Sequence, residues 1–167
     1  MAYVITDPRL QMQSIATTDT TQNHALGTRV KAADPTTYGE GVFVYLLGVA
    51  STVVGSLVSY NATTWQTALS ANTANLAGPV AVAMSANVAS QYGWYQIAGL
   101  AVIKKTAVIV LAQVAIYQSA TTGRIMSTAA SGKQILGARS ANLTSVVSAT
   151  STVVVSIEYP HKQGAVL

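Results

Sequence analysis

Few residues in this chain have side chains suited to acid–base, nucleophilic or metal chemistry. Its 167 residues include two histidines, five acidic residues and no cysteine. A hydrolytic triad would need His24 or His161 as its base, and no G-x-S-x-G sequence supplies a nucleophile. A metal site would need both histidines and an aspartate to converge from distant segments. We therefore expect no enzyme, no cofactor and no metal site.

Two short motifs match known signatures only in part. Gly132 and Lys133 match the end of a phosphate-binding loop, but Gln134 stands where Ser or Thr should follow, and the earlier glycine is missing. Asn61 and Asn142 each begin an N-x-T sequence. Without a secretory signal we interpret these as chance matches to the glycosylation sequence.

Charge is scarce and unevenly spread. Charged residues make up 8% of the chain, whereas about a quarter is usual for a soluble domain. No Asp, Glu, Lys or Arg occurs in the sixty-three residues from Gly41 to Ile103. The nine basic residues are scattered, which predicts no nucleic-acid binding. A chain that is half apolar and so poor in charge is expected to cover much of its surface with other chains.

The most apolar stretch, residues 99–117, has two lysines near its middle, Lys104 and Lys105. Each lysine costs roughly 2.5–3.5 kcal/mol at the centre of a membrane helix. We therefore predict no membrane segment. The N-terminal sequence MAYVITDPRL lacks the basic and apolar regions of a signal peptide, so we expect synthesis in the cytoplasm.

Residues 1–34 differ in composition from the rest. They are polar, rich in Gln and Thr, and show no helical or strand periodicity. We predict an extended N-terminal arm over residues 1–34 and a body over residues 35–167. Two interpretations of the arm remain open: a tail without contacts, and an arm that becomes ordered on a neighbouring subunit.

The body is predicted to be all-β: a compact barrel or sandwich of about eight to ten short antiparallel strands joined by glycine turns. Alternation at residues 92–97 places Tyr92 and Trp94 on one face of a strand and Tyr95 on the other. Residues 107–118 are predicted to form a strand buried on both faces. Residues 152–159 are predicted to form a strand that ends before Pro160. A helical turn within residues 62–77 is left open.

The aromatic cluster at residues 92–95 has three interpretations. It can be a packed core, a contact between subunits, or a platform on which a sugar stacks. We favour the core or intersubunit interpretations. The candidate interface residues are Arg9, Leu10, Met12 and Ile15 in the arm, and Tyr92, Trp94 and Tyr95 in the cluster.

Several short motifs resemble those of a known family. They are GVFVY at 41–45, GSLV at 55–58, PVAVA at 79–83, YGWYQ at 92–96 and the glycine at position 99. Together they cover residues 38–140, and they resemble the small β-rich decoration, or cement, proteins of tailed-bacteriophage capsids. The resemblance implies a protein that binds the outer surface of an icosahedral shell, often as a trimer, and clamps neighbouring major capsid subunits.

The expected partners are thus the major capsid protein and other copies of this chain in a homotrimer. The expected location is the outer capsid surface of the virion, after synthesis in the cytoplasm of the host bacterium. Two rival classes remain. One is another virion component, such as a head-fibre or tail subunit. The other is a free-standing β-barrel that binds a ligand at the Trp94 cluster.

Overall fold

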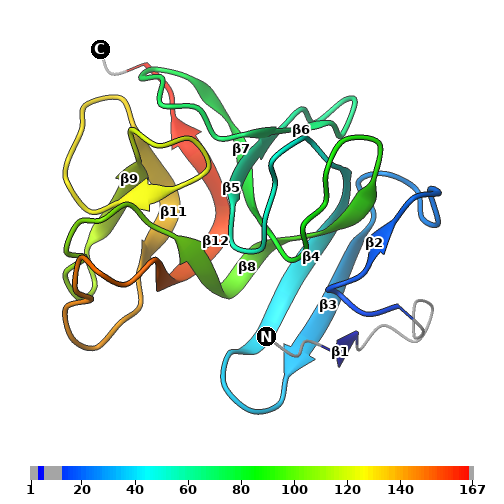
Figure 1. Ribbon diagram of the computed structural model, residues 1–167, viewed down its shortest axis with the longest axis horizontal. Coiled ribbons are helices and arrows are strands. Elements are labelled where there is room, and N and C mark those ends of the chain that lie inside the picture. The colour runs from blue at the N-terminus through cyan, green and yellow to red at the C-terminus, as the bar shows by residue number, and fades with distance from the viewer. Residues whose placement is uncertain (1–3, 6–12, 166–167) are drawn as a thin grey trace.

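The protein is all-β, as the sequence predicts. The computed structural model describes residues 4–5 and 13–165, and these residues contain twelve strands and no helix. The strands pair into one antiparallel sheet that is not closed and that folds over itself like a sandwich (Figure 1). The strands are β1 (Val4–Ile5), β2 (Thr18–Asp19), β3 (Arg29–Asp34), β4 (Gly39–Leu47), β5 (Leu57–Tyr60), β6 (Thr67–Leu69), β7 (Ala77–Ala83), β8 (Tyr92–Lys104), β9 (Ala115–Gln118), β10 (Ile125–Met126), β11 (Gln134–Ser140) and β12 (Thr152–Gln163).

Strand β8 joins the two halves of the molecule. Its first part pairs with β4 and β7, and its second part pairs with β12 over residues 98–104. The main path of the sheet runs β1-β3-β4-β8-β7-β12-β11-β9-β10. In Figure 1, β3 and β4 lie on one side of β8, and β9, β11 and β12 lie on the other. The positions of both halves therefore depend on the course of this one strand.

The course of β8 changes at Gly99. Its φ of 99° lies in a region that favours glycine, and a Cβ at this position would lie 2.6 Å from the carbonyl oxygen of Glu40. The buried side-chain amide of Gln96 donates hydrogen bonds of 3.1 Å to the carbonyl oxygens of Ala98 and Leu100 on either side of the bend. The register with β4 shifts here as well, which marks a β-bulge.

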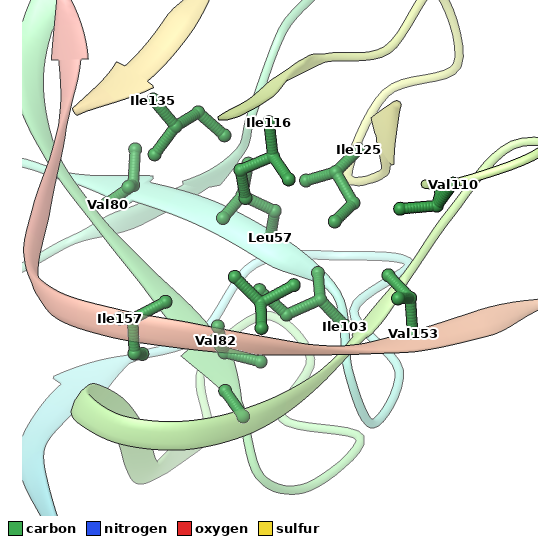
Figure 2. Packing of buried hydrophobic residues seen from close by; sticks show 12 residues of the cluster. Leu57, Val80, Val82, Ile103, Val110, Ile116, Ile125, Ile135, Val153 and Ile157 are labelled. Carbon is green, nitrogen blue, oxygen red and sulfur yellow. The ribbon is translucent and has the colours of Figure 1, made fainter. Parts of the chain in front are cut away.

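The interior consists of three apolar clusters. One lies between β4, β5, β7 and β8 and contains Tyr95 and Ile97. A second fills the half built on β12 and draws side chains from seven strands and a loop, among them Leu57, Ile103 and Val110 (Figure 2). The third lies on the other face of β4 and β8 and contains Trp94, with residues from the N-terminal part of the chain. The predicted alternation at residues 92–97 is thus confirmed.

The described part of the predicted arm lies on the body. Strand β3 pairs with β4 through six residue pairs, so the boundary predicted between residues 34 and 35 falls inside a β-hairpin. Residues 13–28, here called the N-terminal segment, lie over the Trp94 face, and Ile15 is buried there. This packing could not be predicted from periodicity, because isolated side chains such as Ile15 make the contacts and no repeating apolar pattern results. Residues 6–12 of the predicted arm lie outside the described residues.

Two local predictions differ from the structure, at residues 107–114 and at Pro160, and the structure also decides the question left open at residues 62–77. Residues 107–114 form an irregular loop, and only Ala115–Gln118 of the predicted strand is β9. Residues 62–64 form one isolated turn, in which the Trp65 N–H donates to the carbonyl of Asn61 at 2.8 Å, and the described residues 62–77 contain no helix. Strand β12 continues past Pro160 to Gln163, because a bulge there shifts the register between β11 and β12. A proline is compatible with a strand at such a bulge, where its missing N–H is not needed for the ladder.

Candidate protein-interaction surface

Most of the predicted interface residues that the structure describes are interior. Trp94 and Tyr95 are fully buried and Ile15 nearly so, while Tyr92 is half-buried beside the Trp94 cluster. Trp94, Tyr95 and Ile15 therefore cannot contact a partner while the chain keeps this fold. The remaining predicted interface residues, Arg9, Leu10 and Met12, lie outside the described residues.

A polar network joins the N-terminal segment to the Trp94 face. The indole nitrogen of Trp94 donates to Gln13 Oε1 at 3.1 Å, and Gln13 Nε2 donates to Asp19 Oδ2 at 2.5 Å. Asp19 Oδ2 also accepts a 2.6 Å hydrogen bond from the hydroxyl of Tyr45. His24 Nε2 lies 2.5 Å from Gln13 Oε1. The bonds from Trp94 and Tyr45 tie the N-terminal segment to β8 and β4, and the bonds of Gln13 to Asp19 and His24 join residues within the segment.

The same network contains the groups that most resemble a catalytic site. Burial, together with the hydrogen bond to Asp19, raises the pKa of Tyr45 well above its usual value. Its hydroxyl therefore stays protonated and donates to the carboxylate at neutral pH. Ring packing fills the remaining space: the centroids of Tyr45 and Trp94 are 5.0 Å apart, and His24 packs edge-on against Tyr45 at 5.1 Å. The arrangement stabilises the segment and leaves Trp94 enclosed.

A different surface is built from two loops at one end of the β12 half. Residues 106–114 follow β8, and residues 141–151 follow β11; together they are called the loop pair (Figure 1). The backbone of Val110 exchanges two hydrogen bonds with that of Val146, at 3.0 and 2.8 Å. This antiparallel bridge places Ile109 opposite Val147.

Alternation across the bridge separates an inner from an outer face. Val110 is fully buried, and Figure 2 shows it within the apolar cluster of the β12 half. Its neighbours Ile109 and Leu111 point to the other side and are 55% and 54% exposed. On the second loop Val147 is 60% and Leu143 is 88% exposed. Four large aliphatic side chains are thus exposed to solvent on adjoining loops.

A buried lysine on the inner side of the loop pair hydrogen-bonds the backbone of both loops. Lys105 is fully buried, and its Nζ donates to the carbonyl oxygens of Val108 at 2.8 Å, Thr106 at 3.3 Å and Ser148 at 3.4 Å. Its three donors thus face three backbone acceptors drawn from both loops. Burial lowers the pKa of this lysine. The side chain acts as a crosslink between the two loops.

Other side chains fix the outer parts of the loops. Ser140 Oγ donates to the carbonyl of Leu111 at 2.9 Å, and Ser127 Oγ donates to the carbonyl of Ile109 at 2.7 Å. The side-chain amide of Asn142 donates to the carbonyl of Val110 at 3.4 Å. The loop backbone is therefore bonded to three neighbouring segments. Exposed apolar side chains on such a fixed backbone lose little conformational entropy when they bind a partner.

The sequence of the loop pair, taken alone, indicates buried strands and not an exposed surface. Residues 107–111 form an uncharged apolar run, which is usually an interior strand, and residues 143–147 include Thr144 and Ser145 beside three aliphatic residues. The structure exposes Ile109, Leu111, Leu143 and Val147. Exposed aliphatic side chains therefore lie in the loop pair, whereas Trp94 and Tyr95 are interior.

The described residues offer little for small-molecule chemistry. No group of three or more His, Asp or Glu side chains within residues 4–5 and 13–165 could hold a metal ion. Two depressions on the described surface lack any histidine or pair of carboxylates. One depression lies at the β11–β12 bulge and is lined by Gly137, Ala138, Arg139, Ser156 and Glu158. The other lies beside the turn before β11 and is lined by Tyr117, Ala129, Ala130, Ser131, Gly132, Gln134 and Gln163.

Comparisons of the chain with protein-family models, curated proteins and solved structures gave no match. Across the residues that the structure describes, no helix is long and apolar enough to cross a membrane. The candidate functional site is the loop pair, because it exposes four large aliphatic side chains on a hydrogen-bonded backbone.

Proposed function

We propose that this protein is a structural component of a bacteriophage virion. In this proposal it binds the outer surface of an icosahedral capsid as a homotrimer and holds neighbouring major capsid subunits together. The observation that carries the proposal is the loop pair, where four large aliphatic side chains stand exposed on a hydrogen-bonded backbone. Contiguous exposed apolar surface on a soluble domain usually marks a binding site for another protein.

The rest of the chain supports a role in assembly. A protein that reinforces a shell needs contact area more than a pocket, since specific interfaces bury about 1,200–2,000 Å². Sixty-three consecutive residues without charge give this body an unusually apolar composition. Attachment through several copies multiplies modest affinities. The short motifs between residues 38 and 140 that resemble capsid decoration proteins point the same way.

The alternative of a ligand-binding barrel receives no support from the Trp94 cluster. Trp94 is fully buried, and its indole nitrogen is already hydrogen-bonded to Gln13. A sugar could stack on this ring only after the N-terminal segment had left the body. A head-fibre or tail subunit would also expose apolar surface, and it is distinguished from a decoration protein by its location on the particle.

The proposal is tested by mixing the purified chain with capsids purified without it. The mixture is pelleted, the stoichiometry is measured, and the particles are imaged by cryo-electron microscopy. We expect saturable binding with density at fixed positions on the icosahedral lattice. Density on fibres or tails would favour the other virion component. Failure to bind any part of the particle would overturn the proposal.

A truncation separates the arm from the body. Removal of residues 1–30 would take away Ile15, Asp19 and Val30 and uncover the Trp94 face, so loss of binding by that variant would report unfolding. Removal of residues 1–12 leaves the polar network and the buried N-terminal contacts in place. We expect the shorter variant to stay folded and to bind capsids more weakly if the arm contacts a neighbour.

A further inference from the structure

Basic side chains predominate around the loop pair, and the acidic Glu158 lines the same depression as Arg139. No Asp or Glu occurs between Gly41 and Ile157, whereas five basic residues do. Three of them flank the loop pair. Lys104 pairs with Thr152 at the end of the second loop, and the guanidinium of Arg124 donates to the carbonyl of Lys105 at 3.3 Å. Arg139 is exposed, and the residue after it, Ser140, bonds the first loop.

This surface therefore has an aliphatic centre and a basic edge. Its exposed centre is formed by Ile109, Leu111, Leu143 and Val147. Interfaces usually combine an apolar core with a polar rim, and charges of opposite sign on the partner orient the encounter. The surface thus has the composition of one half of an interface whose other half carries acidic residues.

We propose that the loop pair docks on a partner protein that presents an apolar patch edged by Asp and Glu carboxylates. This inference rests on the proposed function, in which the partner is the capsid shell. Two loop pairs facing each other are disfavoured, because each would bring its basic edge against that of the other. Like charges opposed across an interface cost several kcal/mol.

Two other classes of partner fit the surface less well. A nucleic acid would satisfy the basic edge but would leave four aliphatic side chains against phosphates and sugars, without an aromatic ring for stacking. Loops that enter a membrane interface are usually rich in Trp and Tyr. Residues 106–114 and 141–151 contain no aromatic residue. A protein surface is the occupant that matches both the centre and the edge.

The test measures binding of variants to purified capsids that lack this chain. One variant, Leu111→Ser with Leu143→Ser, removes the aliphatic centre, and we expect each change to weaken binding roughly tenfold or more. A second, Arg124→Glu with Arg139→Glu, reverses the edge and is expected to slow association, with the largest effect below about 0.15 M salt.

Matched controls come from the opposite end of the same half. Leu76 is 42% exposed, and the next residues begin β7, while Lys133 Nζ is bonded to Asn72 at 2.8 Å. Strand β11 separates Lys133 from the loop pair by seven residues, or about 20 Å at 3.3 Å per residue. Leu76→Ser and Lys133→Glu should bind capsids as the wild type does. Circular dichroism and the thermal midpoint confirm that every variant is folded.

The outcomes separate the inference from the proposed function. Weaker binding of both loop-pair variants with normal binding of both controls supports docking on an acidic-edged surface. Normal binding by the loop-pair variants, while the wild type binds capsids, overturns the inference and leaves the proposed function standing. Loss of the homotrimer in the Leu111→Ser, Leu143→Ser variant would assign the surface to self-association. Retention on anionic vesicles or on DNA, without binding to capsids, would overturn both proposals.

Discussion

The indole nitrogen of Trp94 donates a 3.1 Å hydrogen bond to the side-chain oxygen of Gln13, a residue eighty-one positions earlier in the chain. Through this bond the N-terminal segment completes the burial of the largest side chain in the interior. The segment is therefore a covering layer of the body from residue 13 onward. The same contact provides a spectroscopic probe, since tryptophan emission depends on burial.

Replacement of Gln13 by Ala is expected to loosen this layer. Trp94 would lose its acceptor and Asp19 one of its donors, and a buried polar group without a partner costs about 1–3 kcal/mol. We predict a red-shifted Trp94 emission and a lower denaturation midpoint, both measured in a Trp65→Phe background. Gln22→Ala, at an exposed position of the same segment, serves as the control. Identical emission and midpoint in the two variants would contradict the prediction.

Alanine substitutions at Gly39 and Gly99, which both have a positive φ, distinguish the cost of backbone strain from the cost of a steric clash. Gly39 has a φ of 65° and open space where a Cβ would lie, whereas a Cβ at Gly99 would lie 2.6 Å from the Glu40 carbonyl. Gly39→Ala should cost only the strain of the left-handed region, about 1–2 kcal/mol. Gly99→Ala should cost clearly more, because the bend in β8 must move. Urea denaturation of both variants measures the difference, and equal costs would show that the bend tolerates a side chain.

Lys105 offers a test of the crosslink beneath the loop pair. Lys105→Met keeps the apolar stem but leaves the carbonyls of Thr106, Val108 and Ser148 without this donor. We expect a loss of about 1–3 kcal/mol, because the variant removes the buried donor that these carbonyls share. Hydrogen exchange should accelerate in residues 106–114 and 141–151. Lys104→Met, at the adjacent half-buried position, should leave exchange in the loops unchanged.

Asp34 predicts a pH dependence at the β3–β4 turn. Its Oδ1 accepts hydrogen bonds from the backbone N–H groups of Thr36 and Thr37 and from the Thr36 hydroxyl, and those from Thr36 are the main cause of a lowered pKa. Because the folded-state pKa is below the usual 3.8, this carboxylate stabilises the fold above pH 3.8. That stability is lost as the pH falls through the lowered folded-state value.

The measurement is the thermal midpoint as a function of pH, with the carboxyl resonance of Asp34 followed by NMR. Asp34→Asn keeps an acceptor oxygen but cannot titrate. The variant should therefore show a flatter acid limb than the wild type. An Asp34 resonance that titrates at or above 3.8 would refute the assignment of these hydrogen bonds as stabilising.

Alternation in the sequence predicted the strands that have different surroundings on their two faces. The two faces of residues 92–97 pack in two different apolar clusters. In residues 153–157 one face packs in the cluster of the β12 half and the other is partly exposed. Periodicity records exactly such differences between faces. Periodicity did not predict the position of Tyr159. This residue lies in the β-bulge opposite Gly137, where its φ is 44° and its side chain is 53% exposed.

The loop pair could not be predicted from the same kind of signal. Ile109 and Leu111 have the side chains of an interior strand, and nothing in their order distinguishes a buried position from an exposed one. Composition did indicate that some apolar surface would be exposed. Its position depends on the Val110–Val146 bridge, which joins residues thirty-six positions apart and leaves no local pattern.

The sharing of β8 between two halves also sets the order in which the chain can fold during synthesis. The first part of β8 can pair with β4 once residue 98 has left the ribosome. Its second part must wait for β12, the last strand of the described residues, because residues 98–104 pair with residues 152–158. Until then Ala101 and Ile103 have no cover from β12. Nascent chains that stop before β12 should therefore recruit chaperones or aggregate, and the β12 half should form only after residues 152–163 have left the ribosome.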